Sequence, residues 1–251
     1  MVDNEIYSDW KNKKSKNLKS LAVLIDPDKT NKEQLSKLCS KSLNGLIDYF
    51  FVGGSLLTTN NMDFVISFLK ENCKIPVIIF PGNTLQVNLK ADGILLLSLI
   101  SGRNADLLIG KQIEVAPILH KANIEVISTG YILIESGKSN SVSYISNTTP
   151  IPNDKPEITT ATVIAGEMLG LSSIYLEAGS GALNSVSTET IKMVSENSNT
   201  PLIVGGGIRD IKTAEEIYKA GADIIVVGTQ IEKDVSFINE LSILRKIKTS
   251  I

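Results

Sequence analysis

The chain has 251 residues, of which 43% are hydrophobic, so it can bury one sizeable core, as a single α/β barrel or as two small domains. Its formal net charge of −2 and its 5% aromatic content argue against a nucleic-acid partner, because such proteins present basic patches and stacking side chains. No apolar run approaches the roughly 20 residues of a membrane span, and the polar N-terminus lacks a signal-peptide core. We therefore expect a cytoplasmic protein without a transmembrane segment.

Residues 1–20 are polar and lysine-rich, and they predict a helical extension that packs Trp10 against the rest of the chain. Apolar runs typical of buried parallel strands then recur at Leu21–Ile25, Tyr49–Val52, Pro76–Phe80, Ile94–Leu97, Ile124–Ile127, Ile174–Glu177, Leu202–Val204 and Ile224–Val227. Helical spacing lies between them at Lys32–Leu43, Met62–Leu69, Ala105–Leu119, Thr160–Leu169, Val186–Glu196, Ile211–Ala220 and Ile231–Ile247. This alternation predicts a (β/α)8 TIM barrel that forms one domain over residues 1–251.

Two connections depart from the regular repeat. Only Pro81 to Gly93 separates the third and fourth strands, which is too short for a full crossover helix, so we expect a degenerate third helix or an extended piece. The fifth strand is followed by a long polar segment, Ser128 to Thr159, which we expect to form a lid or binding loop.

The two cysteines and the single histidine are not expected to carry chemistry. Cys39 and Cys73 lie on separate predicted helices without metal-ligand spacing, so we expect them to be reduced and buried. His120 ends a helical stretch ahead of the fifth strand, on the bottom side of the barrel, so we expect it to have a surface or helix-end role and not to take part in a zinc site or a catalytic triad.

The sixth predicted strand ends in a carboxylate followed by a glycine loop. Strand alternation puts Tyr175 and Glu177 on one face, with Glu177 at the point where the strand ends. The loop Gly179-Ser180-Gly181 can bring bare backbone N–H groups up to an anion. A proton acceptor beside such a loop indicates chemistry on a small phosphorylated substrate, although a polar strand end and a routine turn would read the same way.

Two further glycine loops strengthen the phosphate interpretation. The seventh and eighth strands end in Gly205-Gly206-Gly207 and Gly228-Thr229, each ahead of a helix, and βα loops of a barrel collect at one face. Loops after the seventh and eighth strands form the usual phosphate site of this fold. Arg209 could help to hold the phosphate or could anchor the loop.

The first strand is followed by Asp26-Pro27-Asp28, and the second by a loop containing Ser55. A carboxylate and a hydroxyl one loop apart suit Mg²⁺, which keeps water or phosphate oxygens as further ligands. Taken alone, however, Asp-Pro-Asp is more often a turn and helix cap.

The combination of motifs resembles the geranylgeranylglyceryl phosphate synthase family, in the branch with both bacterial and archaeal members. The resemblance rests on LIDPDK (24–29), FFVGGS (50–55), SNTTPIP (146–152), IYLEAGSGA (174–182), VGGGIR (204–209) and VVGT (226–229). Members of this family are prenyltransferases with a modified TIM barrel that join glycerol 1-phosphate to a polyprenyl diphosphate. The resemblance thus implies an ether-lipid precursor as the product.

The family's site residues can be carried over by position. Asp26 and Ser55 match its Mg²⁺ ligands. The glycerol-phosphate contacts match Tyr175, Leu176, Glu177, Ala178, Gly179, Ser180, Gly181, Gly206, Gly207, Gly228 and Thr229. Some relatives have a lysine where this chain has Leu24, so that phosphate contact is missing or replaced.

From these parts we expect geranylgeranyl diphosphate and sn-glycerol 1-phosphate as substrates, Mg²⁺ as the cofactor, Glu177 and Tyr175 as catalytic residues, and a homo-oligomer. Glu177 would take the proton of the attacking C3 hydroxyl. The segment after the fifth strand and the degenerate third helix would form the walls of a groove for the prenyl tail. The alternatives are another phosphate-binding barrel enzyme, such as a phosphosugar isomerase, and a catalytically silent metabolite-binding barrel.

Overall fold

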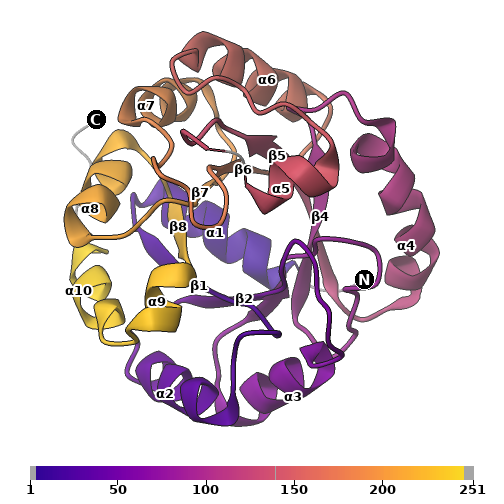
Figure 1. Cartoon of the computed structure of the whole chain (residues 1–251), viewed down its shortest axis with the longest axis vertical. Helices are drawn as coiled ribbons and strands as arrows, with labels where there is room; N and C mark the ends of the chain where they lie inside the picture. Colours follow the sequence, from indigo (N-terminus) through magenta and orange to yellow (C-terminus); the bar gives the residue numbers. More distant parts are fainter. Residues whose placement is uncertain (1–3, 139, 246–251) are drawn as a thin grey trace.

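The computed structural model describes residues 4–138 and 140–245. Eight parallel strands pair in chain order and β8 pairs with β1, so the sheet closes into a barrel. Figure 1 shows the strands at the centre, within a ring of helices. The strands are β1 Ser20–Ile25, β2 Tyr49–Val52, β3 Val77–Ile79, β4 Gly93–Leu99, β5 Glu125–Leu133, β6 Ser173–Glu177, β7 Leu202–Gly205 and β8 Ile224–Val227. The predicted (β/α)8 barrel is confirmed.

The helices pack outside the strands, except at the two ends of the barrel. They are α1 Glu5–Ser15, α2 Lys32–Leu43, α3 Met62–Asn72, the π-helix η1 Asp106–Gly110, α4 Lys111–Lys121, α5 Ser141–Ser146, α6 Pro156–Met168, α7 Thr188–Asn197, α8 Ile211–Ala220, α9 Thr229–Lys233 and α10 Phe237–Leu244. In the described part of the chain, none has the length and apolar character required to cross a bilayer.

Side chains alternate between two apolar layers along each strand, as the strand period requires. On β6, Ile174 and Leu176 pack in the layer between strands and helices, whereas Tyr175 points into the barrel interior. Tyr175 and Glu177 both line the cavity described below, which confirms the prediction that they share one face of the strand.

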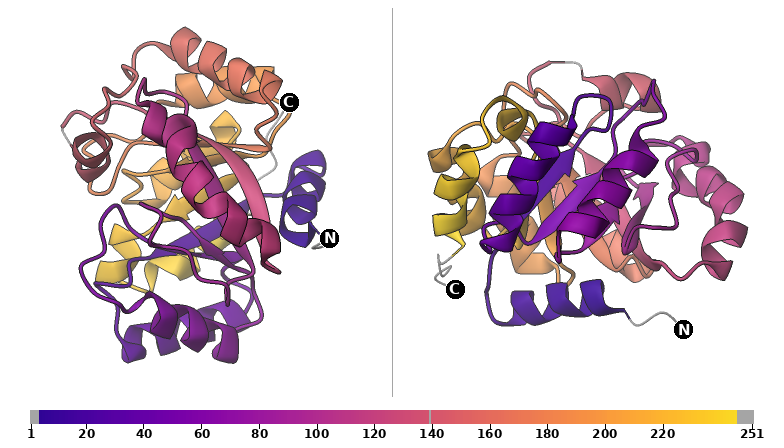
Figure 2. Two further views of the ribbon diagram at one scale, coloured as in Figure 1. Left: turned by 90° about the vertical axis from the view of Figure 1, so that its right-hand side faces the viewer. Right: turned by 90° about the horizontal axis from the view of Figure 1, so that it is seen from below.

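Helix α1 closes one end of the barrel, opposite the end on which α5 lies (Figure 2). The Glu125 carboxylate accepts hydrogen bonds of 2.8 Å from the N–H groups of Ile6 and Tyr7, in the first turn of α1. Trp10 is 1% exposed and packs against Tyr49, with ring centroids 5.8 Å apart. The predicted docking of Trp10 on the barrel is confirmed.

No helix connects β3 to β4 in the described chain, in agreement with the short segment between them. A buried side chain, Gln86, holds this connection in place instead. Its Oε1 accepts the N–H groups of Gly54 and Gly82 at 3.3 and 3.1 Å, and its Nε2 donates to Gly54 O at 2.7 Å. Gln86 thereby ties the loop after β3 to the loop after β2.

Strand β5 is longer than predicted, which corrects the expected start of the loop that follows it. Ser128, Thr129 and Gly130 resemble a strand end, but they lie inside β5 and pair with β4. The polar side chain of Thr129 is accommodated because its hydroxyl bonds Ile127 O and Ser173 Oγ, both at 2.9 Å. Ser98 likewise lies inside β4, and its hydroxyl donates to Leu108 O at 2.8 Å.

The last predicted helix, Ile231–Ile247, is two helices, α9 and α10. The break occurs at Asp234, whose carboxylate accepts the N–H and the hydroxyl of Ser236, both at 2.8 Å. Such a local turn competes with the helical hydrogen bonds. The predicted residues 246 and 247 lie outside the described residues.

The expectation of two separate reduced cysteines is wrong in this structure, which joins Cys39 and Cys73 in a disulfide with the Cα atoms 5.5 Å apart. Their sequence separation of 34 conceals their proximity, which arises because α2 and α3 pack beside each other around the barrel. His120 is exposed in the last turn of α4, as expected for a helix-end residue.

Candidate active site

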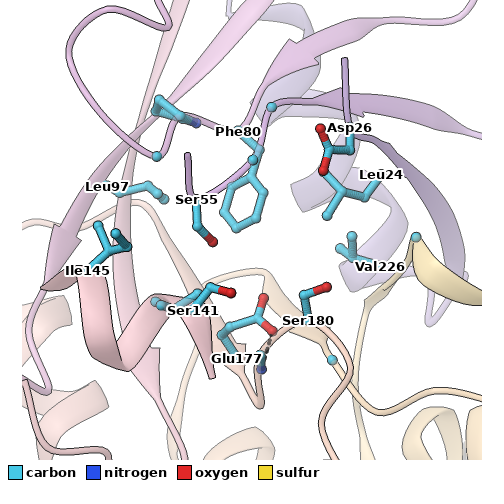
Figure 3. A pocket seen from close by; sticks show the side chains of 18 of the residues that line it. Leu24, Asp26, Ser55, Phe80, Leu97, Ser141, Ile145, Glu177, Ser180 and Val226 are labelled. Carbon is cyan, nitrogen blue, oxygen red and sulfur yellow. Dashed lines mark hydrogen bonds between the residues drawn. The ribbon is translucent and has the colours of Figure 1, made fainter. Parts of the chain in front are cut away.

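A cavity of about 1330 Å³ opens at the C-terminal ends of the strands. Glu177 and Ser180 lie on one side of it, and Asp26, Ser55 and Phe80 lie on the other (Figure 3). The cavity therefore brings together the carboxylate, the glycine loops and the two expected metal ligands, which are far apart in the sequence.

Glu177 is the most buried carboxylate that lines this cavity, with 5% of the residue exposed. Burial raises its pKa to about 7, because a low-dielectric site disfavours the charged form. The N–H of Gly179 donates to Oε1 at 2.5 Å and opposes that rise by stabilising the carboxylate. At neutral pH Glu177 can thus both accept and release a proton, which is what a general base requires.

Tyr175 lies beneath Glu177 in a group of aromatic rings. Its ring stacks on Phe80, with centroids 5.0 Å apart and planes 6° apart, and Tyr131 lies 5.5 Å from it. The hydroxyl is buried and forms no hydrogen bond of standard geometry with the described residues, but it is close enough to the Glu177 carboxylate to help lower the pKa of that group. A Cβ at Gly205 would lie 2.2 Å from this hydroxyl, so only glycine fits above it.

The glycine loops after β6, β7 and β8 converge around Glu177, as predicted. Gly206 has a positive φ of 84°, and a Cβ there would lie 2.7 Å from Glu177 Oε1, so glycine allows the β7 loop to approach the carboxylate. Ser180 Oγ lies 3.4 Å from Thr229 Oγ1, which links the loops of β6 and β8.

The loop residues differ in what surrounds them. A Cβ at Gly207 would meet Ser185 N at 2.7 Å, so this glycine is needed for packing against the β6–α7 loop. A Cβ at Gly181 would instead point into open space, with only Lys138 Nζ near it, at 3.9 Å. The side chains of Leu176 and Ala178 pack in the outer apolar layer, so only their backbone could reach a ligand.

The first aspartate of the Asp-Pro-Asp motif faces the cavity, and the second stabilises a loop. Asp26 pairs with Lys29 Nζ at 2.7 Å and accepts the N–H of Asp28 at 3.0 Å. The Asp28 carboxylate accepts hydrogen bonds from the N–H and hydroxyl groups of Thr58 and Thr59, and these hold its pKa at about 2. Asp28 thus secures the loop that carries Ser55.

Asp26 and Ser55 fit a magnesium ion that keeps most of its ligands from water and phosphate. Both line the cavity, and the described residues contain no cluster of three histidine, cysteine or acidic side chains that could hold a metal. One carboxylate and one hydroxyl would be a poor zinc or calcium site, but they suit Mg²⁺ bound together with a diphosphate.

Arg209 anchors the β6 loop, which is one of the two roles predicted for it. Its guanidinium donates to Gly181 O at 3.4 Å and also to Ala182 O. Both bonds come from one guanidinium nitrogen, Nη2, while Arg209 also lines the cavity.

The apolar half of the cavity comes largely from residues that the sequence did not single out. Leu95, Leu97 and Leu99 of β4 and Val115 of α4 line it, together with Val142 and Ile145 of α5. The run Leu95-Leu96-Leu97 is apolar at every position, so its period does not indicate which side chains face inward. The long segment after β5 does contribute a wall, as predicted, through α5.

The chain is similar in sequence and fold to known proteins over nearly its whole length. Residues 10–248 match the pattern of the PcrB family. The geranylgeranylglyceryl phosphate synthase of Chitinophaga pinensis is 50% identical over 241 residues, which cover 96% of each chain. That of Korarchaeum cryptofilum is 41% identical over 213 residues, covering 85% of this chain and 87% of the relative.

A solved structure supports the same relationship in three dimensions. The (S)-3-O-geranylgeranylglyceryl phosphate synthase of Thermoplasma acidophilum, crystallised with sn-glycerol-1-phosphate, is 31% identical and superposes with a TM-score of 0.89. The match covers 97% of this chain and 98% of that one.

Proposed function

The chain belongs to the PcrB family, and we propose on that basis that it is a prenyltransferase that joins geranylgeranyl diphosphate to the C3 hydroxyl of sn-glycerol 1-phosphate. The products are a prenyl ether and diphosphate. The observation that carries this proposal is the buried Glu177, with a pKa of about 7, beside three glycine loops and opposite Asp26.

The glycine loops would bind the phosphate group of glycerol 1-phosphate. The Gly179 N–H is already directed at Glu177, so the phosphate would accept from the backbone of Ser180 and Gly181 and from the β7 and β8 loops. With its phosphate there, the substrate's C3 hydroxyl can extend toward Glu177, the base in the same cradle.

The reaction breaks the bond between the allylic carbon and the diphosphate oxygen and forms a bond from that carbon to the C3 oxygen. The hydroxyl proton moves to the Glu177 carboxylate, and the bonding electron pair leaves with diphosphate. Positive charge that develops on the allylic carbon can be stabilised by aromatic faces, which Phe80, Tyr131 and Tyr175 provide in this cavity. We assign Tyr175 a catalytic role for this reason.

Asp26 and Ser55 would hold Mg²⁺, which when bound supplies charge neutralisation for the departing diphosphate. The ion pair between Asp26 and Lys29 leaves a cation beside the same carboxylate, so the diphosphate would meet positive charge on this side of the cavity. The apolar wall of Leu97, Val142 and Ile145 suits the prenyl tail.

We also propose a homo-oligomer in the cytoplasm. The side chains of Ile109, Ile113 and Ile118, on η1 and α4, are each more than half exposed, and such apolar surface favours self-association. Light scattering coupled to gel filtration tests the oligomer, and a monomer at micromolar concentration would contradict it.

The proposed function is tested with purified protein, Mg²⁺, and geranylgeranyl diphosphate and its shorter and longer homologues. Each is supplied with sn-glycerol 1-phosphate or, as the matched control, with its mirror image sn-glycerol 3-phosphate. We expect a prenyl ether by mass spectrometry and equimolar diphosphate, with preference for the 1-phosphate. Absence of an ether product with every chain length would contradict the proposal.

A further inference from the structure

The phosphate cradle of this chain has no obvious positively charged side chain. Arg209 stands beside it, but Nη2 of its guanidinium donates to the carbonyls of Gly181 and Ala182 and so holds the side chain to the β6 loop. At the neighbouring end of β1 the cavity is lined by Leu24, which carries no charge. A phosphate carries close to two negative charges at neutral pH, so a cradle of backbone N–H groups alone would leave much of that charge without an ionic partner.

Two of the other lysines that line the cavity are paired with carboxylates. Lys29 pairs with Asp26 at 2.7 Å, and Lys111 pairs with Glu114 at 2.7 Å. Lys233 ends α9 and lines the cavity, and within the described part of the chain it forms no ion pair. Lys138 forms none there either, and it differs from Lys233 in that its Nζ lies beside the glycine loop, near Gly181.

The backbone on either side of Lys138 is fixed to the β6–α7 loop. Ser136 O accepts the N–H groups of Leu183 and Asn184 at 3.2 and 3.1 Å. On the other side, Asn140 Nδ2 donates to Ala178 O at 3.1 Å, and its side chain packs so closely on Gly179 that a Cβ there would lie 2.2 Å away. Lys138 is thus held against the glycine loop from both directions.

This anchoring directs the lysine at the cradle. Lys138 lines the cavity, and among the described residues other than the chain neighbours of Gly181, its Nζ is the one atom within 4 Å of the position that a Cβ on Gly181 would occupy. We propose that Lys138 is the charged phosphate ligand of this site, reaching from the β5–α5 loop to pair with the phosphate of the glycerol substrate above Gly181.

This inference rests on the proposed function, and it adds a residue that determines substrate binding. Lys138 would select for a phosphorylated glycerol by charge, while the backbone of the glycine loops fixes its orientation. Because the lysine is exposed, its contribution should be reduced by salt. It would act on glycerol-phosphate affinity and leave the prenyl side unchanged.

The experiment uses Lys138→Met, which keeps the aliphatic stem, and Lys138→Arg, which keeps the charge. Lys155→Met is the matched control, since Lys155 is another exposed lysine after β5 and does not line the cavity. Calorimetry with sn-glycerol 1-phosphate should give about tenfold weaker binding for Lys138→Met, with Lys138→Arg within about threefold of the parent and Lys155→Met unchanged. The KM for glycerol 1-phosphate should rise similarly, with little change in kcat or in the KM for the prenyl diphosphate.

Salt separates a charge effect from a change in shape. Raising the ionic strength should weaken binding to the parent protein more steeply than to Lys138→Met. Parent-like affinity in Lys138→Met would overturn the inference and leave the proposed function intact, as would an equal loss in Lys155→Met. A parent protein that fails to bind sn-glycerol 1-phosphate would overturn both the proposed substrate and the role of Lys138.

Discussion

The N–H of Gly179 donates to the carboxylate of Glu177 at 2.5 Å, two residues along the same loop. Burial favours the neutral acid, and this hydrogen bond favours the charged form, so the pKa comes to about 7 rather than higher. The loop that would bind phosphate is therefore also the loop that adjusts the proposed base.

The pH dependence of turnover follows from this pKa. A general base must be ionised, so kcat at saturating substrates should rise as pH increases through about 7 and then level off. Below that pH it should fall about tenfold per unit. A kcat that is constant between pH 5.5 and 8.5 would show that no group of this pKa limits the reaction.

Ionisation of Glu177 increases turnover, but it should decrease the stability of the folded protein. The folded pKa of Glu177 is raised above its usual 4.5, so the folded state favours the protonated side chain. That stabilisation is complete below pH 4.5 and is lost as pH rises through about 7. Glu177→Gln, which never ionises, should therefore gain about 2–3 kcal/mol of stability relative to the parent when the pH is raised from 5 to 8.5. Urea unfolding at the two pH values measures this, and equal differences at both would contradict it.

Asp26→Asn should remove magnesium-dependent turnover and retain glycerol-phosphate binding. The amide keeps the shape of the side chain but loses the charge that a hard cation requires. Asp26 lies across the cavity from Glu177 and the glycine loop, so the phosphate site should not be disturbed (Figure 3). Calorimetry with Mg²⁺ plus diphosphate, and separately with sn-glycerol 1-phosphate, distinguishes the two sites. Loss of glycerol-phosphate affinity would show that they are not independent.

Gly181→Ala tests the cradle more cleanly than a change at Gly207. At Gly207 a methyl group would strike the backbone of Ser185, so loss of function there could follow from local unfolding. At Gly181 the methyl enters the cavity and meets no protein atom closer than 3.9 Å. Glycerol 1-phosphate should then bind at least tenfold more weakly.

The control for that prediction is Gly45→Ala. Gly45 lies at a turn after α2 and does not line the cavity. Both glycines have a φ of 69°, and a Cβ at Gly45 would have no neighbour within 4 Å in the part of the chain that the structure describes. Both variants should therefore lose about 1 kcal/mol of stability from backbone strain. Normal substrate affinity in a correctly folded Gly181→Ala would show that the phosphate lies elsewhere.

Trp10→Ala should destabilise the barrel without altering the chemistry. The indole is almost fully buried at the end of the barrel opposite the site, against Tyr49 and Phe51. Truncating a buried aromatic side chain typically costs about 3–5 kcal/mol. Chemical denaturation measures the loss, and the KM for glycerol 1-phosphate of the folded variant should match the parent. A loss below 1 kcal/mol would mean that α1 does not support the barrel.

The sequence was sufficient to predict the barrel because every strand contains a short apolar run, and several of these runs end at a glycine or a polar residue. Strand β8, Ile224–Val227 before Gly228, was predicted with its observed bounds. Thr129 lies inside β5, where its hydroxyl has hydrogen-bond partners. A polar residue at such a position makes the sequence indicate a strand end where the strand in fact continues. The disulfide of Cys39 depends on which helices become neighbours, and local pattern does not contain that information.

The polar half of the site was more predictable than the apolar half. Glu177 and the glycine loops stand out because strand ends meet at one face of a barrel. Gln86, Lys138 and the inward leucines of β4 depend on side-chain direction and on loops folding back over the barrel. A single glutamine or lysine in a loop carries no periodic signal, so only the three-dimensional structure reveals its position.

The most direct test of the account is ether formation by the parent protein and by Glu177→Gln, with geranylgeranyl diphosphate, sn-glycerol 1-phosphate and Mg²⁺. The parent should form the prenyl ether. The variant should bind glycerol 1-phosphate with similar affinity and form the ether roughly 10²–10⁴-fold more slowly, because only the base is lost. Turnover by Glu177→Gln within a few-fold of the parent would contradict the central claim that Glu177 accepts the proton.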